Sequence, residues 1–179
     1  MRLDQFDNSD FDRGASLFIE GLWRFIEGIF INSWLPGSGW RAALLRLFGA
    51  SIGEGVTIKP HVRIKFPWKF KLGNHSWIGE SVWIDNLAAV TIGNNCCISQ
   101  GAYLCTGNHR WDAEGFDLDA QPITLEDHCW VAGRAVVGPG VIMGEGAILT
   151  LNSVTSVNLS PWHVYAGNPA VMIKKRNRS

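Results

Sequence analysis

The chain has 179 residues and a mass of 19.8 kDa, enough for one domain that buries about 70% of the surface exposed by its unfolded chain. Only 18% of the residues are charged and 46% are hydrophobic, a composition that excludes intrinsic disorder. Sixteen basic residues balance sixteen acidic ones, so no net positive charge attracts the chain to nucleic acid. No nucleic-acid partner is therefore expected.

The cysteines and the first residues of the chain indicate a reducing compartment. No C-x-x-C pair is present, and the start of the chain carries four aspartates instead of the basic and apolar regions of a signal peptide. Reduced thiols in the cytoplasm are therefore expected. The residues concerned are Cys96, Cys97, Cys105 and Cys129, and Asp4, Asp7, Asp10 and Asp12.

Residues 1–48 are predicted to form a short helical segment before the main domain. Over residues 17–35, the charged residues Glu20, Arg24 and Glu27 follow helical spacing and form one narrow polar stripe on an apolar helix. These charges make a membrane span costly. A second helix is expected after the first one. So apolar a helix either packs against the main domain and a partner subunit or makes peripheral contact with a membrane.

From residue 49 onward, a branched aliphatic residue recurs every six positions, often followed by glycine. A period of six fits neither an α-helix nor a hairpin meander, but three short strands per coil place every sixth residue in an internal column. Residues 49–179 are therefore predicted to be an all-β parallel β-helix, with a tail over 161–179. The aliphatic positions are Ile52, Ile58, Ile64, Leu72, Ile78, Ile84, Ile92, Ile98, Leu104, Leu125, Val131, Val137, Met143 and Leu149, continued by Thr155.

The period breaks three times, always after the third aliphatic position of a coil. Two extra residues follow Ile64, two more follow Ile84, and a long excursion over residues 107–122 follows Leu104. Since equivalent positions stack, these segments are predicted to leave the β-helix at one edge and to build a groove there. The groove is expected to be lined by Pro67, Trp68, Phe70, Leu87 and Ala89.

His109 is the histidine that the pattern singles out. It lies where the chain leaves the coils beside the predicted groove, and imidazole exchanges a proton near neutral pH, which suits general-base catalysis. Its orienting partner stays open: Asp112, Glu114, a backbone carbonyl or a neighbouring subunit. The other histidines occupy turns or the tail, and neither histidine nor cysteine spacing fits a zinc site, so no metal is expected.

Several segments outside the repeat are also distinctive. They are Thr106 to His109, Pro122 to Trp130, Pro139 to Val141, Ala166 to Ala170, Leu44 to Ala50, Phe66 to Lys69 and Tyr103 to Gly107. Together with the hexapeptides, the first four resemble the left-handed β-helix acetyltransferases that include galactoside, maltose and nodulation-factor enzymes. The last three are similar to the colanic acid biosynthesis acetyltransferases of exopolysaccharide clusters. The resemblance covers about residues 45–175.

The resemblance implies a left-handed coil, a homotrimer with active sites between neighbouring prisms, and acetyl-CoA as the co-substrate. It further implies direct transfer of the acetyl group to a sugar hydroxyl, with His109 as the base that takes the hydroxyl proton. The positions that match coenzyme-binding residues of the family are Trp130, Gly133, Leu151, Ser156 and Lys174.

The acceptor contacts depart from the family pattern, because the asparagine that holds the galactoside falls near Gly79. Asp85 and Asn86, just before the second break, are predicted to contact the acceptor instead. The ring of Trp68 or Trp111 is expected to stack on the apolar face of the sugar.

The function predicted from the sequence is O-acetylation of a sugar in exopolysaccharide biosynthesis. If residues 17–35 touch the inner face of the membrane, the acceptor is a lipid-linked oligosaccharide on the cytoplasmic leaflet. Two other functions stay open. One is an acyltransferase with another acyl donor or an amine acceptor, and the other is a non-catalytic β-helix that acts as a scaffold or binding module.

Overall fold

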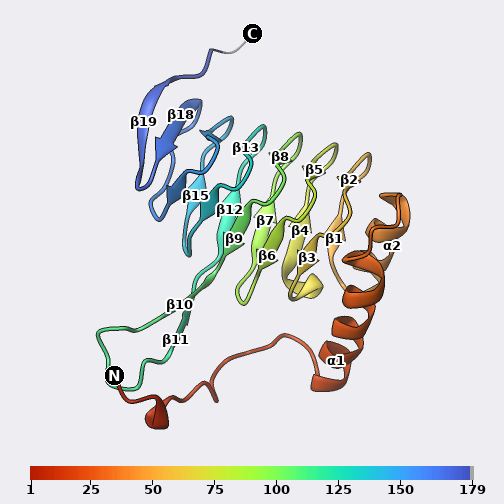
Figure 1. Ribbon diagram of the computed structural model, residues 1–179, viewed down its shortest axis with the longest axis vertical. Helices are drawn as coiled ribbons and strands as arrows, with labels where there is room; N and C mark the ends of the chain where they lie inside the picture. Colours follow the sequence, from red (N-terminus) through yellow and green to blue (C-terminus); the bar gives the residue numbers. More distant parts are fainter. Residues whose placement is uncertain (178–179) are drawn as a thin grey trace.

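The structure is a computed structural model that describes residues 1–177; residues 178–179, the end of the predicted tail, lie outside the described residues. Short parallel strands stack coil upon coil into a prism, with helices α1 (Leu17–Ile26) and α2 (Gly39–Leu47) at one end (Figure 1). One hairpin leaves the prism sideways, and the chain starts beside its tip (Figure 1). The predicted β-helix with a helical N-terminal segment is confirmed.

Three parallel sheets form the faces of the prism. The first face contains β1 (Ser51–Ile52), β4 (Phe70–Leu72), β7 (Val90–Ile92), β12 (Ile123–Leu125) and β15 (Ile142–Met143). The second contains β2 (Thr57–Ile58), β5 (Trp77–Ile78), β8 (Cys97–Ile98), β13 (Trp130–Val131) and β16 (Ile148–Leu149), then β18 (His163–Gly167) and the antiparallel β19 (Ala170–Lys175). The third contains β3 (Arg63–Ile64), β6 (Trp83–Asp85), β9 (Tyr103–Cys105), β14 (Val136–Val137) and β17 (Val154–Thr155).

The predicted six-residue ladder forms the core, since every one of its members is buried. Glycine follows many of them because the coils approach closely there: a Cβ on Gly73 would lie 2.5 Å from the backbone carbon of Gly93. Trp68, Phe70 and Ala89 border a hollow of about 220 Å³, as predicted, but the side chain of Phe70 is only 1% exposed. The extra residues before it form a short 3-10 turn, Pro67–Lys69, and Phe70 then enters β4 two positions before Leu72, which turns both side chains inward.

The first helix is shorter than predicted. Ser16 starts α1 by accepting a hydrogen bond from the Ile19 N–H, and α1 continues as a π-helix, Glu27–Ile31. The chain then leaves the helical conformation before Pro36 and Gly37, which favour a turn, so the predicted helix ends at Ile31 rather than at residue 35.

The region of α1 covers the end of the third face, where the first coil has no preceding coil. The indole Nε1 of Trp23 donates to the Ile64 carbonyl at 2.8 Å, and the Glu27 Oε1 accepts from the Ile64 N–H at 2.6 Å. The two side chains thus satisfy both backbone groups of an edge residue that would otherwise be buried without partners.

The region of α2 does the same for the other two faces. The Ser38 hydroxyl accepts from the Ile58 N–H at 3.0 Å on the second face, and Arg46 Nε donates to the Ile52 carbonyl at 3.1 Å on the first. We call residues 17–47 the cap. Because it occupies the strand edges, it stops the solenoid from pairing with further strands at this end.

Glu27→Gln is expected to raise the free energy of unfolding at neutral pH. Burial raises the pKa of Glu27, and this outweighs the lowering by the Ile64 N–H and by Arg24 and Arg63. Below the unfolded-state pKa of about 4.3, the carboxyl is protonated in both states and burying it adds no charge penalty. As pH rises through the folded-state pKa, the buried carboxyl ionises and the free energy of unfolding falls. Glutamine keeps the oxygen that accepts from Ile64 and removes the buried charge.

Urea unfolding of both proteins between about pH 3.5 and pH 8 measures this difference. We expect the two free energies to converge at the acid end and to separate as pH rises, with the variant more stable. Glu80→Gln, at an exposed glutamate, is the control and should show no such separation. A variant that is less stable than the parent above pH 6 would contradict the assignment.

Candidate functional site

The three extra segments stack at the edge between the third and first faces, which we call the excursion edge. The Nζ of Lys69 donates to the Leu87 carbonyl at 2.8 Å, and the Ala88 N–H donates to the Thr106 Oγ1 at 3.0 Å. A Cβ on Gly107 would lie 2.8 Å from a methyl carbon of Leu87. The segments of successive coils are thus in contact, and their predicted stacking is confirmed.

The third excursion continues as an antiparallel hairpin of β10 (Gly107–His109) and β11 (Leu118–Ala120), which points away from the prism (Figure 1). His109 lies directly opposite Leu118 in the register. Side chains of directly opposed residues share one face of a hairpin, so His109 lies on the same face as Leu118 and Ala120.

A backbone carbonyl orients the His109 ring. The Nδ1 of His109 lies 2.8 Å from the Phe116 carbonyl oxygen. Since a carbonyl only accepts, Nδ1 carries the hydrogen, and Nε2 keeps a lone pair that can accept a proton. The Phe116 ring stacks on the imidazole at 4.3 Å with 5° between the planes, and Phe116 itself has a φ of +54°. The turn therefore holds the imidazole in one tautomer and one orientation.

The N-terminal residues 2–13, which we call the strap, run along this hairpin and the excursion edge before they reach the cap (Figure 1). The Arg2 N–H donates to the Glu114 carbonyl at 2.8 Å, and Phe11 stacks on Phe66 with ring centroids 6.3 Å apart. The ring centroids of Phe6 and His109 are 5.9 Å apart. None of the strap residues was among the predicted site residues.

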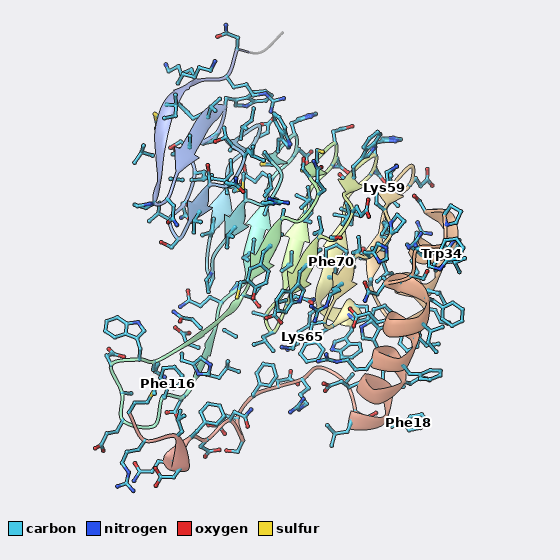
Figure 2. All side chains as sticks on the ribbon, in the orientation of Figure 1. Phe18, Trp34, Lys59, Lys65, Phe70 and Phe116 are labelled. Carbon is cyan, nitrogen blue, oxygen red and sulfur yellow. The ribbon has the colours of Figure 1, made fainter. Side chains whose placement is uncertain are left out.

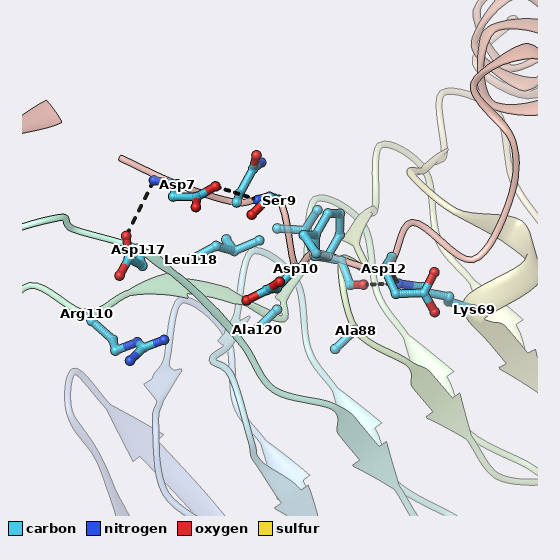
Figure 3. Close-up of a pocket in the computed structure, with 13 residues that line it drawn as sticks. Asp7, Ser9, Asp10, Asp12, Lys69, Ala88, Arg110, Asp117, Leu118 and Ala120 are labelled. Atoms are coloured by element: carbon cyan, nitrogen blue, oxygen red, sulfur yellow. Dashed lines mark hydrogen bonds between the residues drawn. The ribbon is translucent and has the colours of Figure 1, made fainter. Parts of the chain in front are cut away.

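The strap, the hairpin and the excursion edge enclose a pocket of about 380 Å³ (Figure 3). Leu118 and Ala120, from the hairpin face that carries His109, line it together with Arg110 and Asp117, the neighbours of His109 and Leu118 in the chain, whereas His109 itself is not part of the lining. Acidic and basic side chains surround it, and together they can accept hydrogen bonds from, and donate them to, the hydroxyls of a polyol. They belong to Asp7, Asp10, Asp12, Asp117, Lys69 and Arg110.

Neither of the two polar residues predicted to contact the acceptor lines this pocket, and Asp85 faces a separate hollow of about 110 Å³ beside Lys65 and Trp83. The Asp85 carboxylate lies 3.0 Å from Lys65 Nζ and accepts from the Tyr103 hydroxyl at 3.3 Å. Burial, with Cys105 and Asp85 nearby, raises the pKa of Tyr103, which therefore stays a donor. Asn86 is fully buried and its amide bonds both backbone groups of Phe66, at 3.0 and 2.6 Å. The prediction for Asn86 is wrong, because this side chain joins two coils.

The tryptophans predicted to stack on a sugar differ in the same way. Trp68 stacks on Phe66 at 5.2 Å, and its Nε1 donates to the Arg13 carbonyl at 2.7 Å. A Cβ on Gly14 would lie 2.9 Å from the indole. The strap thus covers Trp68, which anchors it and is not a sugar platform. Trp111, at the hairpin tip, is 76% exposed and stays available.

The residues predicted to bind the coenzyme lie mainly at a different edge, between the second and third faces, which we call the Gly133 edge. Trp130 in β13 is 43% exposed and its Nε1 donates to the Ser99 Oγ at 2.9 Å. Gly133 and Leu151 follow in the turns of adjacent coils, and a Cβ on Gly133 would lie 3.2 Å from a methyl carbon of Leu151. Trp130 and Leu151 are exposed and form an apolar strip at this edge, and the buried Gly133 lies against Leu151.

One chain does not bring the whole predicted set together. Ser156 stacks beside Gly138 at the excursion edge, and exposed Lys174 lies on β19, the last strand of the second face. The third face separates His109 from Leu151, and its side of about six residues spans up to about 20 Å. Within one chain, His109 and the strip at the Gly133 edge therefore lie at different edges of the prism.

Residues 1–177 contain no group of three or more histidine, cysteine, aspartate or glutamate side chains arranged to hold a metal ion. Within the same range, no helix has the length and apolarity needed to cross a bilayer. Neither finding assigns a function.

The chain matches no family model. It is 41% identical over 92% of its length to an Escherichia coli (strain K12) protein named "Putative colanic acid biosynthesis acetyltransferase WcaF", of which 91% is covered. It is 25% identical over 76% of its length to the galactoside O-acetyltransferase of the same organism, of which 69% is covered. The fold is similar to that of the Vibrio cholerae hexapeptide-repeat acetyltransferase VCA0836, with a TM-score of 0.81, 25% identity and coverage of 92% and 96%. That protein is also solved with acetyl-CoA, at a TM-score of 0.79, 24% identity and 92% coverage of both chains.

Proposed function

Since the chain belongs to the hexapeptide-repeat acetyltransferases, and is thus an acetyl-CoA-dependent acyltransferase, we propose that it acetylates a hydroxyl of a sugar in exopolysaccharide biosynthesis. The observation that supports this most is the fixed tautomer of His109 beside a polar pocket. The relative named for colanic acid biosynthesis supports the substrate class. The four unpaired cysteines support a cytoplasmic location.

In the proposed reaction the acceptor sugar lies in the pocket between the strap and the hairpin. The Nε2 of His109 takes the proton from the attacking hydroxyl while its oxygen bonds to the thioester carbonyl carbon. The carbon–sulfur bond then breaks, and the coenzyme thiolate leaves and takes up the proton from His109. A positioned base of this kind contributes about 10²- to 10⁴-fold to the rate.

The proposed assembly is a homotrimer in which the excursion edge of one prism faces the Gly133 edge of the next. Three such contacts close a ring and make three equivalent sites. This arrangement is supported by the separation of the two residue sets within one chain. His109 and Asp85 come from one chain, and Trp130, Gly133 and Leu151 come from its neighbour.

Calorimetric titration with acetyl-CoA, followed by a panel of acceptors, tests the proposal. We expect a micromolar to millimolar affinity, about −8 to −4 kcal/mol, and release of coenzyme thiol with neutral sugars. Free amino sugars of the same ring configuration are the comparison, and faster reaction at their amine would favour N-acetylation instead. A well-folded protein that binds no acetyl-CoA would contradict the proposal.

A further inference from the structure

The outer surface of the cap is apolar and exposed. Leu17, Phe18, Phe25, Trp34 and Leu47 are each more than 60% exposed. Figure 2 shows Phe18 and Trp34 on the side of the helices that faces away from the coils. Scattered apolar residues are ordinary on a protein surface, but a continuous apolar face of this kind marks a contact surface.

A groove of about 700 Å³ lies within this surface, and all of its lining residues are apolar. Phe30 and Leu35 form one part of the lining, and Trp40, Leu44 and Leu47 from the region of α2 form another. The apolar surface of the cap therefore extends from α1 across to α2.

The charged residues of the cap are bonded to other parts of the protein. Glu20 pairs with Arg13 and lies 3.7 Å from Arg24. The Arg41 side chain is buried and donates to four backbone carbonyls, and the Arg46 guanidinium donates to two. With Glu27 bonded to the first coil, every charged residue between positions 17 and 47 has a partner inside the molecule. Little charge is left for the outer surface.

The first coil beside the cap gives this end of the prism a positive charge. Residues 17–71, which contain the cap, the first coil and the start of the second, hold eight basic and three acidic residues. The rest of the chain holds eight basic and thirteen acidic residues, and three of these basic residues, Lys174 to Arg176, follow one another at the other end of the prism. Lys59, Arg63 and Lys71 on the coils are exposed. Their charge complements an anionic surface.

We propose that the cap docks on the surface of an anionic lipid bilayer, with its apolar side chains at the level of the headgroups. Tryptophan, phenylalanine and leucine on one face of a helix, next to basic residues, are the features of segments that lie in a membrane interface. In the proposed trimer the three prisms are parallel, so three caps lie in one plane and bind together.

Docking would also define the acceptor of the proposed function. Coils stack about 4.8 Å apart, so the excursion that carries His109, which leaves the third coil, starts about 10 Å from the first coil. A sugar attached to a lipid headgroup could reach the pocket from the bilayer surface. This step rests on the proposed function, whereas the docking itself does not.

Flotation with vesicles tests the docking on the full-length protein. We expect the protein to float with phosphatidylcholine vesicles that contain about one third phosphatidylglycerol, and to float less with phosphatidylcholine alone or in high salt. Phe18→Ser/Trp34→Ser should lower the bound fraction at least about tenfold. Lys59→Gln/Lys71→Gln should lower it with anionic vesicles only.

Val171→Ser/Ile173→Ser, at similarly exposed apolar residues of β19 at the other end of the prism, is the matched control and should float as the parent does. Turnover on a soluble acceptor should be the same in Phe18→Ser/Trp34→Ser as in the parent, which separates docking from catalysis. The proposal is wrong if the parent does not float, or if the cap variant floats equally well. It is also wrong if the cap joins two trimers end to end in solution and binds no vesicles.

Discussion

His109→Ala is expected to lower kcat by about 10²- to 10⁴-fold and to leave the Kd of acetyl-CoA within about twofold. The Phe116 carbonyl holds Nδ1–H, so Nε2 is the atom that can take the hydroxyl proton. Alanine removes that atom without changing the Gly133 edge, where the coenzyme is proposed to bind. The measurements are the rate of coenzyme thiol release with the best acceptor and a calorimetric titration with acetyl-CoA.

His75→Asn is the control for this experiment. His75 is an exposed turn residue with a φ of +56°, a backbone conformation that asparagine tolerates, so the fold should be retained. Its turnover should equal that of the parent. If His109→Ala keeps a turnover within a few-fold of the parent, His109 is not the base, whatever the coenzyme affinity.

The fold could be predicted because the hexapeptide period is a local property with one physical solution. A residue such as Ile78 must be buried, and only a coil of three short strands buries every sixth position in one column. The position of the excursions followed from the same counting, because any extra residues between the third and first faces must leave at that edge. The inward side chain of Phe70 was not predicted, because a 3-10 turn before it restored the strand alternation two residues early.

The site was predicted only in part, because its missing contacts join segments far apart in the sequence. His109 could be found from its place in the motif, but its partner is a carbonyl whose position depends on the turn at Phe116. The covering of Trp68 by the strap depends on a contact 55 residues away. Phe6 and Phe11 among the aspartates were a signal, since apolar rings in an acidic segment need a surface to pack on.

Asn86 illustrates a limit of composition arguments. An asparagine beside a predicted groove has the right chemistry for a sugar hydroxyl, and the same amide also has one donor and one acceptor for a peptide group of the adjacent coil. In the structure the Asn86 amide is hydrogen-bonded to the backbone N–H and carbonyl of Phe66 in the interior. Asp85 lies one position earlier with its side chain on the outside, since successive strand residues point to opposite faces.

Mixing two inactive variants should restore activity if the site is shared between chains. His109→Ala removes the base from the excursion edge, and Gly133→Phe fills the strip beside Leu151, where even a Cβ would lie 3.2 Å from a methyl carbon. Each variant alone is expected to have a turnover at least about 100-fold below the parent. Co-expressed and purified as mixed trimers, the two should recover about a third of the parent activity, because each mixed trimer has one site of three in which both chains contribute an intact edge.

The recovery must depend on exchange of chains between trimers. Trimers of the two variants that are purified separately and mixed without unfolding should stay inactive, and refolding them together should restore turnover. A double variant that carries both substitutions in one chain, co-expressed with the parent, is the second control. The activity of these trimers should fall with the square of the fraction of parent chains, because each working site then needs two parent chains. No recovery in mixed trimers that bind acetyl-CoA would place the base and the coenzyme within a single chain.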